Sequence, residues 1–458
     1  MSGVVPQSSL RDANSLAAQR ALADVHVSPA AWPKHDWWSA YGDPQLDALI
    51  AEALQGSPTL NVAAARARKA LALAAGAHAG EMPRVDLSGA STRERFSANG
   101  LVPPPGGGTT RTVNALQATL SWDIDLWGRN RATAEAALGE ARAAEVDRHA
   151  AELALSTGIA QAYVQLQRAY LQLDVAERTL RQREQIQGLT RDRNAAGLDS
   201  RVELKQAEAA VPATREQIEE LEERIALARN AIAALIGAGP DRGLAITRPA
   251  ATTLKRVEVP VDVPAELIGR RPDVVAQRWR IEAARSAIDA AKAEFYPNVN
   301  LAAFVGLQSL GSATFLNAAS RTFGAGPAFT LPVFDAGRLR ANLAGKDADY
   351  DIAVEQYNQT LVEALRDIVD QLASLRSVAA QREQQAAAIV ATREAYGLAV
   401  LRYREGLGNY LQVLSAEQPL LAQESLQADL DARELELSIN LVRALGGGYV
   451  PGADINVR

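Results

Sequence analysis

Alternating apolar and polar residues mark two regions of the chain as β-hairpins. The apolar side of the first pattern consists of Leu116, Leu120, Trp122 and Ile124. The polar side consists of Gln117, Thr119, Ser121 and Asp123. A similar alternation runs from Val299 to Leu307. This periodicity predicts strands at about 84–98, 111–125, 297–309 and 322–334.

A helical pattern of unusual length follows each predicted hairpin. No proline occurs from Gly128 to Asn194 or from Gly337 to Glu405. At about 1.5 Å per residue, each of these helices would span roughly 100 Å. Glycine readily adopts the left-handed turn that ends a helix, so Gly197 and Gly406 are expected to reverse the chain. The pattern predicts helical hairpins at about 128–237 and 337–446, and further helices at about 43–80 and 264–293.

The two halves of the chain match one another at a constant offset of 209 residues. Gly128-Arg129 matches Gly337-Arg338, and Gly197-Leu198 matches Gly406-Leu407. Turn glycines at equal spacing indicate a duplicated unit. The predicted organisation is a first repeat at 43–237 and a second repeat at 264–446. An N-terminal segment, a linker and a C-terminal tail are predicted to pack around an equatorial region, at 1–42, 238–263 and 447–458.

The predicted fold class is mixed α+β and mainly α. Four strands with one apolar face cannot close a barrel, and open strand edges in lipid leave backbone groups unpaired. If the strands lie in a membrane, several chains must share one barrel, and three chains would supply twelve strands. A long α-helical barrel would continue this transmembrane β-barrel, and the apolar row from Leu116 to Ile124 would face lipid. A soluble coiled-coil scaffold without a pore is the alternative from a different class.

Composition narrows the chemistry that is available to this protein. The chain has 458 residues, a formal net charge of −6 and no cysteine. The absence of cysteine excludes disulfides and thiolate metal sites, and the mild acidity argues against nucleic acid as a partner. The histidines, His26, His35, His78 and His149, show no metal-binding spacing, and no nucleophile–base arrangement is present. We therefore expect no enzyme activity, no cofactor and no metal.

The sequence carries no recognisable targeting segment. No run of about 18 apolar residues predicts a transmembrane helix, and the first residues lack the charged region and apolar core of a signal peptide. The protein is therefore expected to be either cytoplasmic or a chain whose leader peptide is not present. A transmembrane β-barrel remains compatible with this pattern, because its strands alternate.

Several motifs are specific in combination, and they span nearly the whole chain. They are Trp37-Trp38, Tyr41–Asp47, Ser121–Arg129, Arg270–Val274, Leu331–Arg338, Tyr403–Leu407 and Tyr410–Leu414. This set resembles the TolC-like outer-membrane factors, in particular the NodT or OprM type of resistance–nodulation–division (RND) efflux pumps. The resemblance implies a homotrimer in the bacterial outer membrane that extends into the periplasm. It also implies contact with outer-membrane lipid, a periplasmic adaptor (membrane fusion protein) and an inner-membrane RND transporter.

The resemblance places the adaptor-docking tips at the ends of the helical hairpins, at Gly197, Leu198, Gly406 and Leu407. In this family the same end is closed by an iris of helices. The implied function is a passive exit duct for small toxic compounds or drugs, opened by an iris-like movement of these tips. The same architecture serving type I protein secretion is the closest alternative. Many relatives carry a lipidated N-terminal cysteine, which is absent from this chain or was removed with its leader.

The resemblance also indicates gate residues, with departures from the family pattern. Tyr403 falls on the family's gate tyrosine, and Glu203 falls on an acidic position of the neighbouring hairpin. The family's gate arginine aligns with Gly408, and its two ring aspartates align with Gln412 and Ser415. Closure is therefore expected to depend on other contacts, for which Arg404 and Glu405 are candidates.

Overall fold

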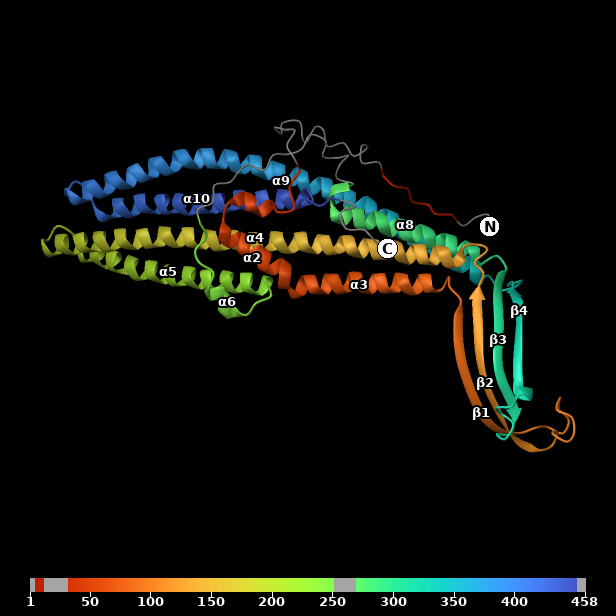
Figure 1. Cartoon of the computed structure of the whole chain (residues 1–458). Coiled ribbons are helices and arrows are strands. Elements are labelled where there is room, and N and C mark those ends of the chain that lie inside the picture. The colour runs from red at the N-terminus through yellow and green to blue at the C-terminus, as the bar shows by residue number, and fades with distance from the viewer. Residues whose placement is uncertain (1–4, 12–31, 251–268, 451–458) are drawn as a thin grey trace. The chain divides into compact units, whose positions relative to one another are not determined.

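The computed structural model describes residues 5–11, 32–250 and 269–450. Within these residues the protein is mainly helical and has one four-stranded sheet (Figure 1), which confirms the predicted fold class at this level. The chain divides into two compact units. The strand unit consists of Met1–Leu10, Arg66–Glu145 and Ala276–Tyr357. The hairpin unit consists of Arg11–Ala65, Val146–Val275 and Asn358–Arg458.

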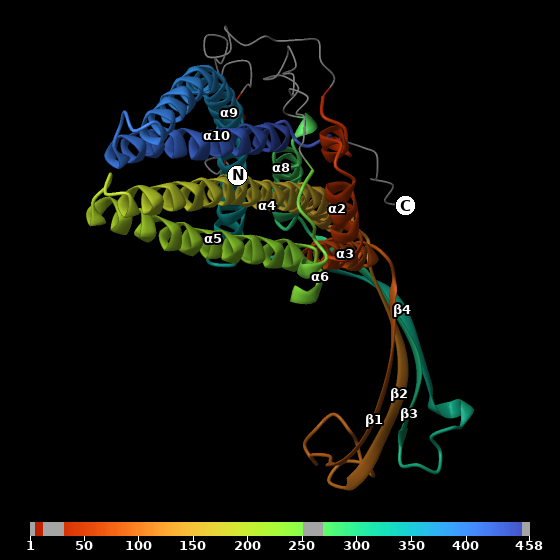
Figure 2. The same cartoon turned by 90° about the vertical axis from the view of Figure 1, so that its left-hand side faces the viewer.

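The sheet of the strand unit is antiparallel throughout, in the order β1-β2-β3-β4 (Figure 2). Its strands are β1 (Arg84–Arg95), β2 (Thr110–Asp123), β3 (Asn298–Leu310) and β4 (Arg321–Thr330). β4 ends four residues before the predicted limit of 334, because Pro332 has no N–H for a strand ladder. In this sheet β1 and β4 each pair on one side only, so both edges are open.

Register places most of the large apolar residues of the four strands on one face of the sheet, while Val113, Phe304 and Leu310 lie on the other. Leu116 lies opposite Leu307, and Leu120 lies opposite Val85 and Ala303. Directly paired residues of antiparallel strands share a face. The same face carries Leu87, Ala118, Trp122, Leu301, Val305, Phe323 and Phe329. Phe323 is 82% exposed and Leu87 is 73% exposed, so this apolar face is uncovered.

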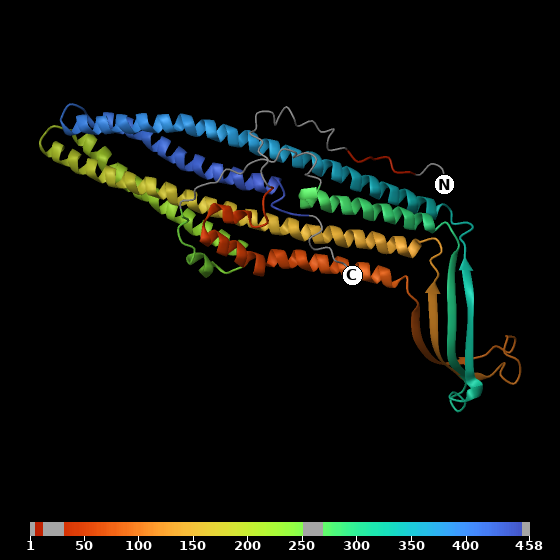
Figure 3. The ribbon, with the colours of Figure 1, turned by 45° about the horizontal axis from the view of Figure 1, so that its top comes forward.

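Four long helices form two antiparallel hairpins (Figure 3). They are α4 (Arg129–Ala195), α5 (Arg201–Leu235), α9 (Arg338–Arg404) and α10 (Tyr410–Ala444). Adding 209 to the bounds of α4 and α5 gives the bounds of α9 and α10. The glycines at Gly197 and Gly406 have φ of 73° and 76°, a conformation that costs glycine little and other residues more.

Shorter helices complete the two units. The helix predicted at about 43–80 is split into α2 (Pro44–Gly56) and α3 (Pro58–Ala79). Ser57 between them is extended, with φ −62° and ψ 128°, because a residue before proline avoids the helical region. α6 (Pro240–Leu244) follows α5, and α8 (Pro272–Ala293) precedes β3.

The hairpin unit has a main hydrophobic core in which the short helix η2 (Trp37–Tyr41) and α2 pack on the long helices. Buried members of this core include Trp37, Leu49, Ile50, Ile159, Ile232 and Ile439. Parts of the predicted segments 1–42, 238–263, 264–446 and 447–458 lie outside the described residues, at 1–4, 12–31, 251–268 and 451–458. None of the helices in the described ranges is long and apolar enough to cross a membrane.

Candidate functional site

The two hairpin tips have the same backbone design. The N–H of Leu198 donates to the carbonyl of Arg193 at 2.9 Å, and the N–H of Leu407 donates to that of Arg402 at 2.8 Å. This six-to-one bond after a left-handed glycine is a Schellman motif, which satisfies the last carbonyls of the helix. Both leucines stay on the surface, with Leu198 66% and Leu407 71% exposed. The tips predicted as docking sites are therefore tight turns, each closed by a backbone hydrogen bond and presenting one exposed leucine side chain.

Tyr403 is the centre of a polar cluster that joins the two hairpins near their tips. The residue is fully buried. Its hydroxyl donates to Asp199 Oδ2 at 2.5 Å and lies 2.8 Å from Thr190 Oγ1. Tyr403 belongs to α9, whereas Thr190 is in α4 and Asp199 lies in the turn after α4. The tyrosine therefore fastens the second hairpin to the first within one chain.

Arg193 completes this cluster, which we call the tip lock (Thr190, Arg193, Asp199 and Tyr403). Its guanidinium donates to both oxygens of Asp199, at 3.0 and 3.3 Å, and its Cζ lies 4.7 Å from the centre of the Tyr403 ring. Only 12% of the Arg193 side chain and 6% of the Asp199 side chain are exposed. A fork-shaped ion pair that also covers an aromatic ring holds all three groups in fixed positions.

The tip lock keeps the phenol of Tyr403 neutral. Burial, followed by the hydrogen bond to Asp199, raises the pKa of Tyr403 from 10.0 to about 12. The neutral phenol is the form that donates to Asp199. A raised pKa means that this stabilisation is complete below pH 10 and disappears as the pH rises through about 12.

Alkaline pH is therefore expected to loosen the hairpin tips. Conductance of the reconstituted protein should rise between pH 10 and 12, and Tyr403→Phe should remove this component because no phenol is left to ionise. Tyr396→Phe is the control, because Tyr396 also has a pKa raised to about 12 by burial but contributes no bond to the tip lock. A rise that persists unchanged in Tyr403→Phe would contradict this assignment.

Glu203, the acidic gate residue predicted from the sequence, does not contact Tyr403. Its carboxylate accepts the backbone N–H of Ser200 at 2.9 Å and is bonded by the Ser200 hydroxyl, which forms a capping box at the start of α5. That hydroxyl lowers the pKa of Glu203. The acidic partner of Tyr403 in this chain is Asp199, which is not among the predicted gate residues. Asp199 follows the tip residues Gly197 and Leu198 directly, so its place in the sequence could have indicated it as a gate candidate.

The remaining gate candidates lie on the surface around the second tip. Arg404, Glu405, Gln412 and Ser415 are exposed. The Ser415 hydroxyl donates to the Gln412 carbonyl at 3.0 Å. A Cβ added at Gly408 would lie 2.8 Å from Gln412 Oε1, so this amide fills the space that a side chain at that position would use. In the described part of the chain, the side chains of Arg404, Glu405, Gln412 and Ser415 form no hydrogen bond or ion pair with the tip lock. Their role at a gate stays a prediction.

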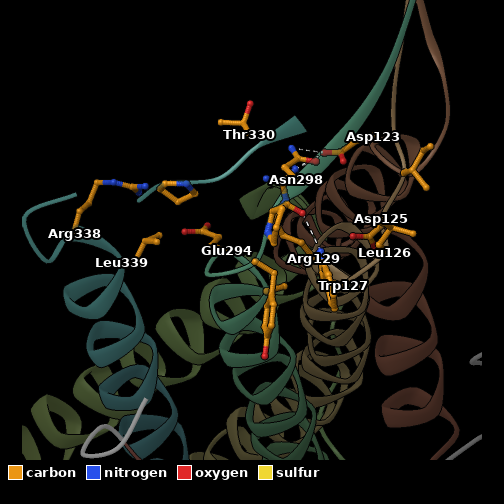
Figure 4. Close-up of a pocket in the computed structure, with 15 residues that line it drawn as sticks. Asp123, Asp125, Leu126, Trp127, Arg129, Glu294, Asn298, Thr330, Arg338 and Leu339 are labelled. Carbon is orange, nitrogen blue, oxygen red and sulfur yellow. Dashed lines mark hydrogen bonds and ion pairs between the residues drawn. The ribbon is translucent and has the colours of Figure 1, made fainter. Parts of the chain in front are cut away.

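A second candidate site is a cavity of about 500 Å³ in the strand unit, where the strands meet the helices (Figure 4). Arg129 binds Asp123 at 2.5 Å, and the Asn298 amide donates to the same carboxylate at 3.2 Å. The rings of Trp127 and Tyr296 stack with their centres 4.7 Å apart. These contacts join the end of β2 to the start of α4 and to β3, so the cavity is part of a braced junction.

Three of the predicted lipid-facing residues, Leu116, Leu120 and Trp122, lie on the apolar face of the sheet, and Ile124 follows directly after the end of β2. Leu116 is 39% and Trp122 is 38% exposed, and Leu120 and Ile124 are half-buried. The opposite face carries polar side chains such as Ser121 and Asn300, which bond each other across the strands at 3.2 Å, together with Phe304. In the described parts of the chain, no group of three or more histidine, aspartate or glutamate side chains could hold a metal ion.

Comparisons of sequence and of structure find known proteins that are similar to this chain. The chain is 37% identical over 439 residues to the multidrug resistance outer membrane protein MdtP of Escherichia coli K12, covering 94% of this chain and 89% of MdtP. It is 40% identical over 346 residues to the fusaric acid resistance protein FusA of Burkholderia cepacia, covering 75% of this chain and 65% of FusA. The crystal structure of the outer membrane protein VceC of Vibrio cholerae is similar with a TM-score of 0.86 and 38% identity, covering 91% of this chain and 100% of VceC.

The combination of two long helical hairpins with a short antiparallel sheet thus defines a protein of the outer-membrane-factor class. Residues 49–238 and 263–447 match the family described as outer membrane efflux protein. The chain belongs to this family.

Proposed function

We propose that this protein is the outer-membrane exit duct of a tripartite efflux system. It conducts small toxic compounds or drugs passively from the periplasm, or from the pump, to the outside, and performs no chemistry. An inner-membrane RND transporter supplies the energy, and a periplasmic adaptor joins the two. MdtP is named for multidrug resistance and FusA for fusaric acid resistance, which supports small toxic molecules as the cargo class.

The main support for this proposal is the structure of the four-stranded sheet. It has two open edges and one exposed apolar face. An exposed apolar sheet with unpaired edges aggregates in water, and in lipid its edge groups lack hydrogen-bond partners. Both problems disappear when β4 of one chain pairs with β1 of the next and the apolar face contacts lipid. The chain is therefore a part of a closed transmembrane barrel.

Three chains are the arrangement we propose. Two chains would give eight strands, and a barrel of about eight strands has an interior that side chains fill. Three chains give twelve strands, which leaves room for an aqueous path lined by the polar face of Gln117, Thr119, Ser121 and Asp123. The equal offset of all four long helices supports an internal duplication. Such a duplication would give each chain two nearly equivalent helical hairpins for the proposed helical barrel.

The tips are the proposed gate and docking surface. Leu198 and Leu407 present matching apolar side chains, which suits an adaptor that contacts both hairpins in the same way. The tip lock holds the hairpins together in the closed state, and an iris-like movement of the tips opens the duct. Because Tyr403, Asp199 and Arg193 belong to one chain, part of the closure is independent of neighbouring subunits.

The protein in detergent is expected to have a molecular mass three times the 48.8 kDa of one chain, measured by light scattering with size-exclusion chromatography. Reconstituted in planar lipid bilayers, it should form ion-conducting pores. A control with Trp122→Asp and Phe323→Asp, which place charge on the apolar face, should lose insertion because charged side chains in lipid are costly. A monomer without conductance would overturn the duct and favour a scaffold.

A further inference from the structure

Arg183 on α4 joins both helical hairpins at one buried point. Its Nη2 and Nε donate to the carboxylate of Glu417 on α10 at 2.9 and 3.2 Å, and its Nη1 donates to Thr214 Oγ1 on α5 at 2.9 Å. Only 20% of the Arg183 side chain and 5% of the Glu417 side chain are exposed. Arg183 therefore belongs to the first hairpin through Thr214 and holds the second hairpin through Glu417.

Each return helix has a proline next to this contact. Pro212 lies inside α5, two residues before Thr214, and Pro419 lies inside α10, two residues after Glu417. A proline in a helix lacks the N–H that would bond the carbonyl four residues earlier, and its ring pushes that carbonyl away. The two return helices are therefore easiest to bend at the level that Arg183 clamps.

The buried hydrophobic residues of the two hairpins form two separate clusters, one near the tips and one in the main core. A cluster near the tips contains Ile186, Ala207, Tyr396, Tyr403, Tyr410, Val413 and Leu420. The main core is a separate cluster, with Ile225 and Ile232 from α5 and Leu435 and Ile439 from α10. Between the two clusters the Arg178–Glu424 ion pair joins α4 to α10, and Arg168–Asp429 joins the same two helices beside the main core. The tip segments can therefore shift while the main core stays packed.

We propose that the second hairpin opens by bending α10 at Pro419, and that the Arg183–Glu417 pair is the latch that keeps this bend closed. The proposal rests on the gated duct proposed above and adds the position of its hinge. Arg183 is a positioning residue in this scheme, because it acts through Glu417 and touches no cargo. The tip lock and the latch then act in series, one at the tip and one about two to three turns of α4 further from it.

Glu417→Gln is expected to raise the fraction of time that reconstituted channels spend open by about tenfold, because losing one charge-assisted hydrogen bond shifts an equilibrium by roughly this factor. This variant leaves the Arg183 charge buried and can fail to fold. The second variant is Arg183→Met with Glu417→Leu, which replaces the pair by apolar groups and preserves stability in comparable cases. It should open as readily as Glu417→Gln, since the latch is gone in both.

Two further variants distinguish loss of the latch from a nonspecific effect of changing charge or helix stability. Pro419→Ala restores a helical hydrogen bond in α10 and is expected to reduce opening. Glu184→Gln is the matched control, because Glu184 is adjacent to Arg183 but pairs with the exposed Arg215 inside the first hairpin at 2.8 Å. It should leave the open fraction unchanged.

Distances between the tips provide a readout that does not need a working channel. The chain has no cysteine, so Leu198→Cys and Leu407→Cys accept spin labels at these two positions alone. The latch variants should give longer and broader distance distributions, and Pro419→Ala narrower ones. Conducting channels with unchanged open fractions and distances overturn the latch but leave the duct standing. If no variant conducts, the duct is overturned, and the spin-label distances alone accept or reject the latch.

Discussion

Tyr403→Phe and Asp199→Asn are each expected to make the closed protein leak. Tyr403→Phe removes the hydroxyl that donates to Asp199 at 2.5 Å. Asp199→Asn removes the carboxylate that binds both Tyr403 and Arg193. A hydrogen bond to a charged group contributes roughly 1.5–3 kcal/mol, so the closed state should lose about tenfold or more in population. Single-channel recording in planar bilayers measures this change directly.

Two controls make the gate experiment specific. Tyr396→Phe removes a hydroxyl from the same buried cluster without touching the tip lock, and should leave conductance unchanged. Glu203→Gln tests the residue that the sequence indicated. Glutamine also completes a capping box, so Glu203→Gln should keep the cap of α5 and leave both stability and conductance nearly unchanged. Leakage from Glu203→Gln, together with tight closure of Asp199→Asn, would reverse our assignment of the acidic partner.

Gly446→Ala is expected to be the most damaging substitution at a glycine in the hairpin unit. Gly446 has φ of 89°, and a Cβ there would lie 2.0 Å from the carbonyl oxygen of Arg270. That neighbour is backbone and cannot rotate away. The cost therefore exceeds the 1–2 kcal/mol of a left-handed residue, and we expect about 4 kcal/mol or more, or no folded protein. Thermal unfolding followed by far-UV circular dichroism measures the loss.

Gly197→Ala is the matched comparison for backbone strain alone. Its φ of 73° is similar, but no heavy atom lies within 4 Å of an added Cβ. It should lower stability by about 1 kcal/mol and yield folded protein. Equal stability of the two alanine variants would show that the close approach to Arg270 makes no contribution to the loss of stability.

The contacts near Gly446 also give a structural role to the Arg270–Val274 motif, which the sequence showed only as part of the family resemblance. Arg271 donates to both oxygens of Asp273, at 3.0 and 2.6 Å, and to the carbonyl of Ala444 at 3.3 Å. Only 11% of its side chain is exposed. The Arg-Arg-Pro-Asp run thus joins the start of α8 to the end of α10. Because Gly446 after α10 has no side chain, the backbone there can pass close to Arg270 and Arg271.

Sequence periodicity determined the kinds of element and their order in this protein. Helices predicted at about 128–194 and 337–405 occupy 129–195 and 338–404, and Leu116, Leu120 and Trp122 of the predicted apolar row lie on one face of β2. These features depend on residues three, four or two positions apart, which a local pattern records. The break at Ser57 is also a local feature, since Pro58 stands in the sequence and a residue before proline avoids the helical region, but the predicted helix at 43–80 did not include it.

Only the tertiary structure decided which side chains meet. Asp199 and Glu203 are four residues apart, yet one enters the tip lock and the other caps α5. Arg183 and Glu417 are 234 residues apart in sequence and share one buried ion pair. Such contacts depend on the rotation and axial register of one long helix against another. A shift of one residue rotates a side chain by about 100° around its helix, and no pattern within a single helix fixes that relation.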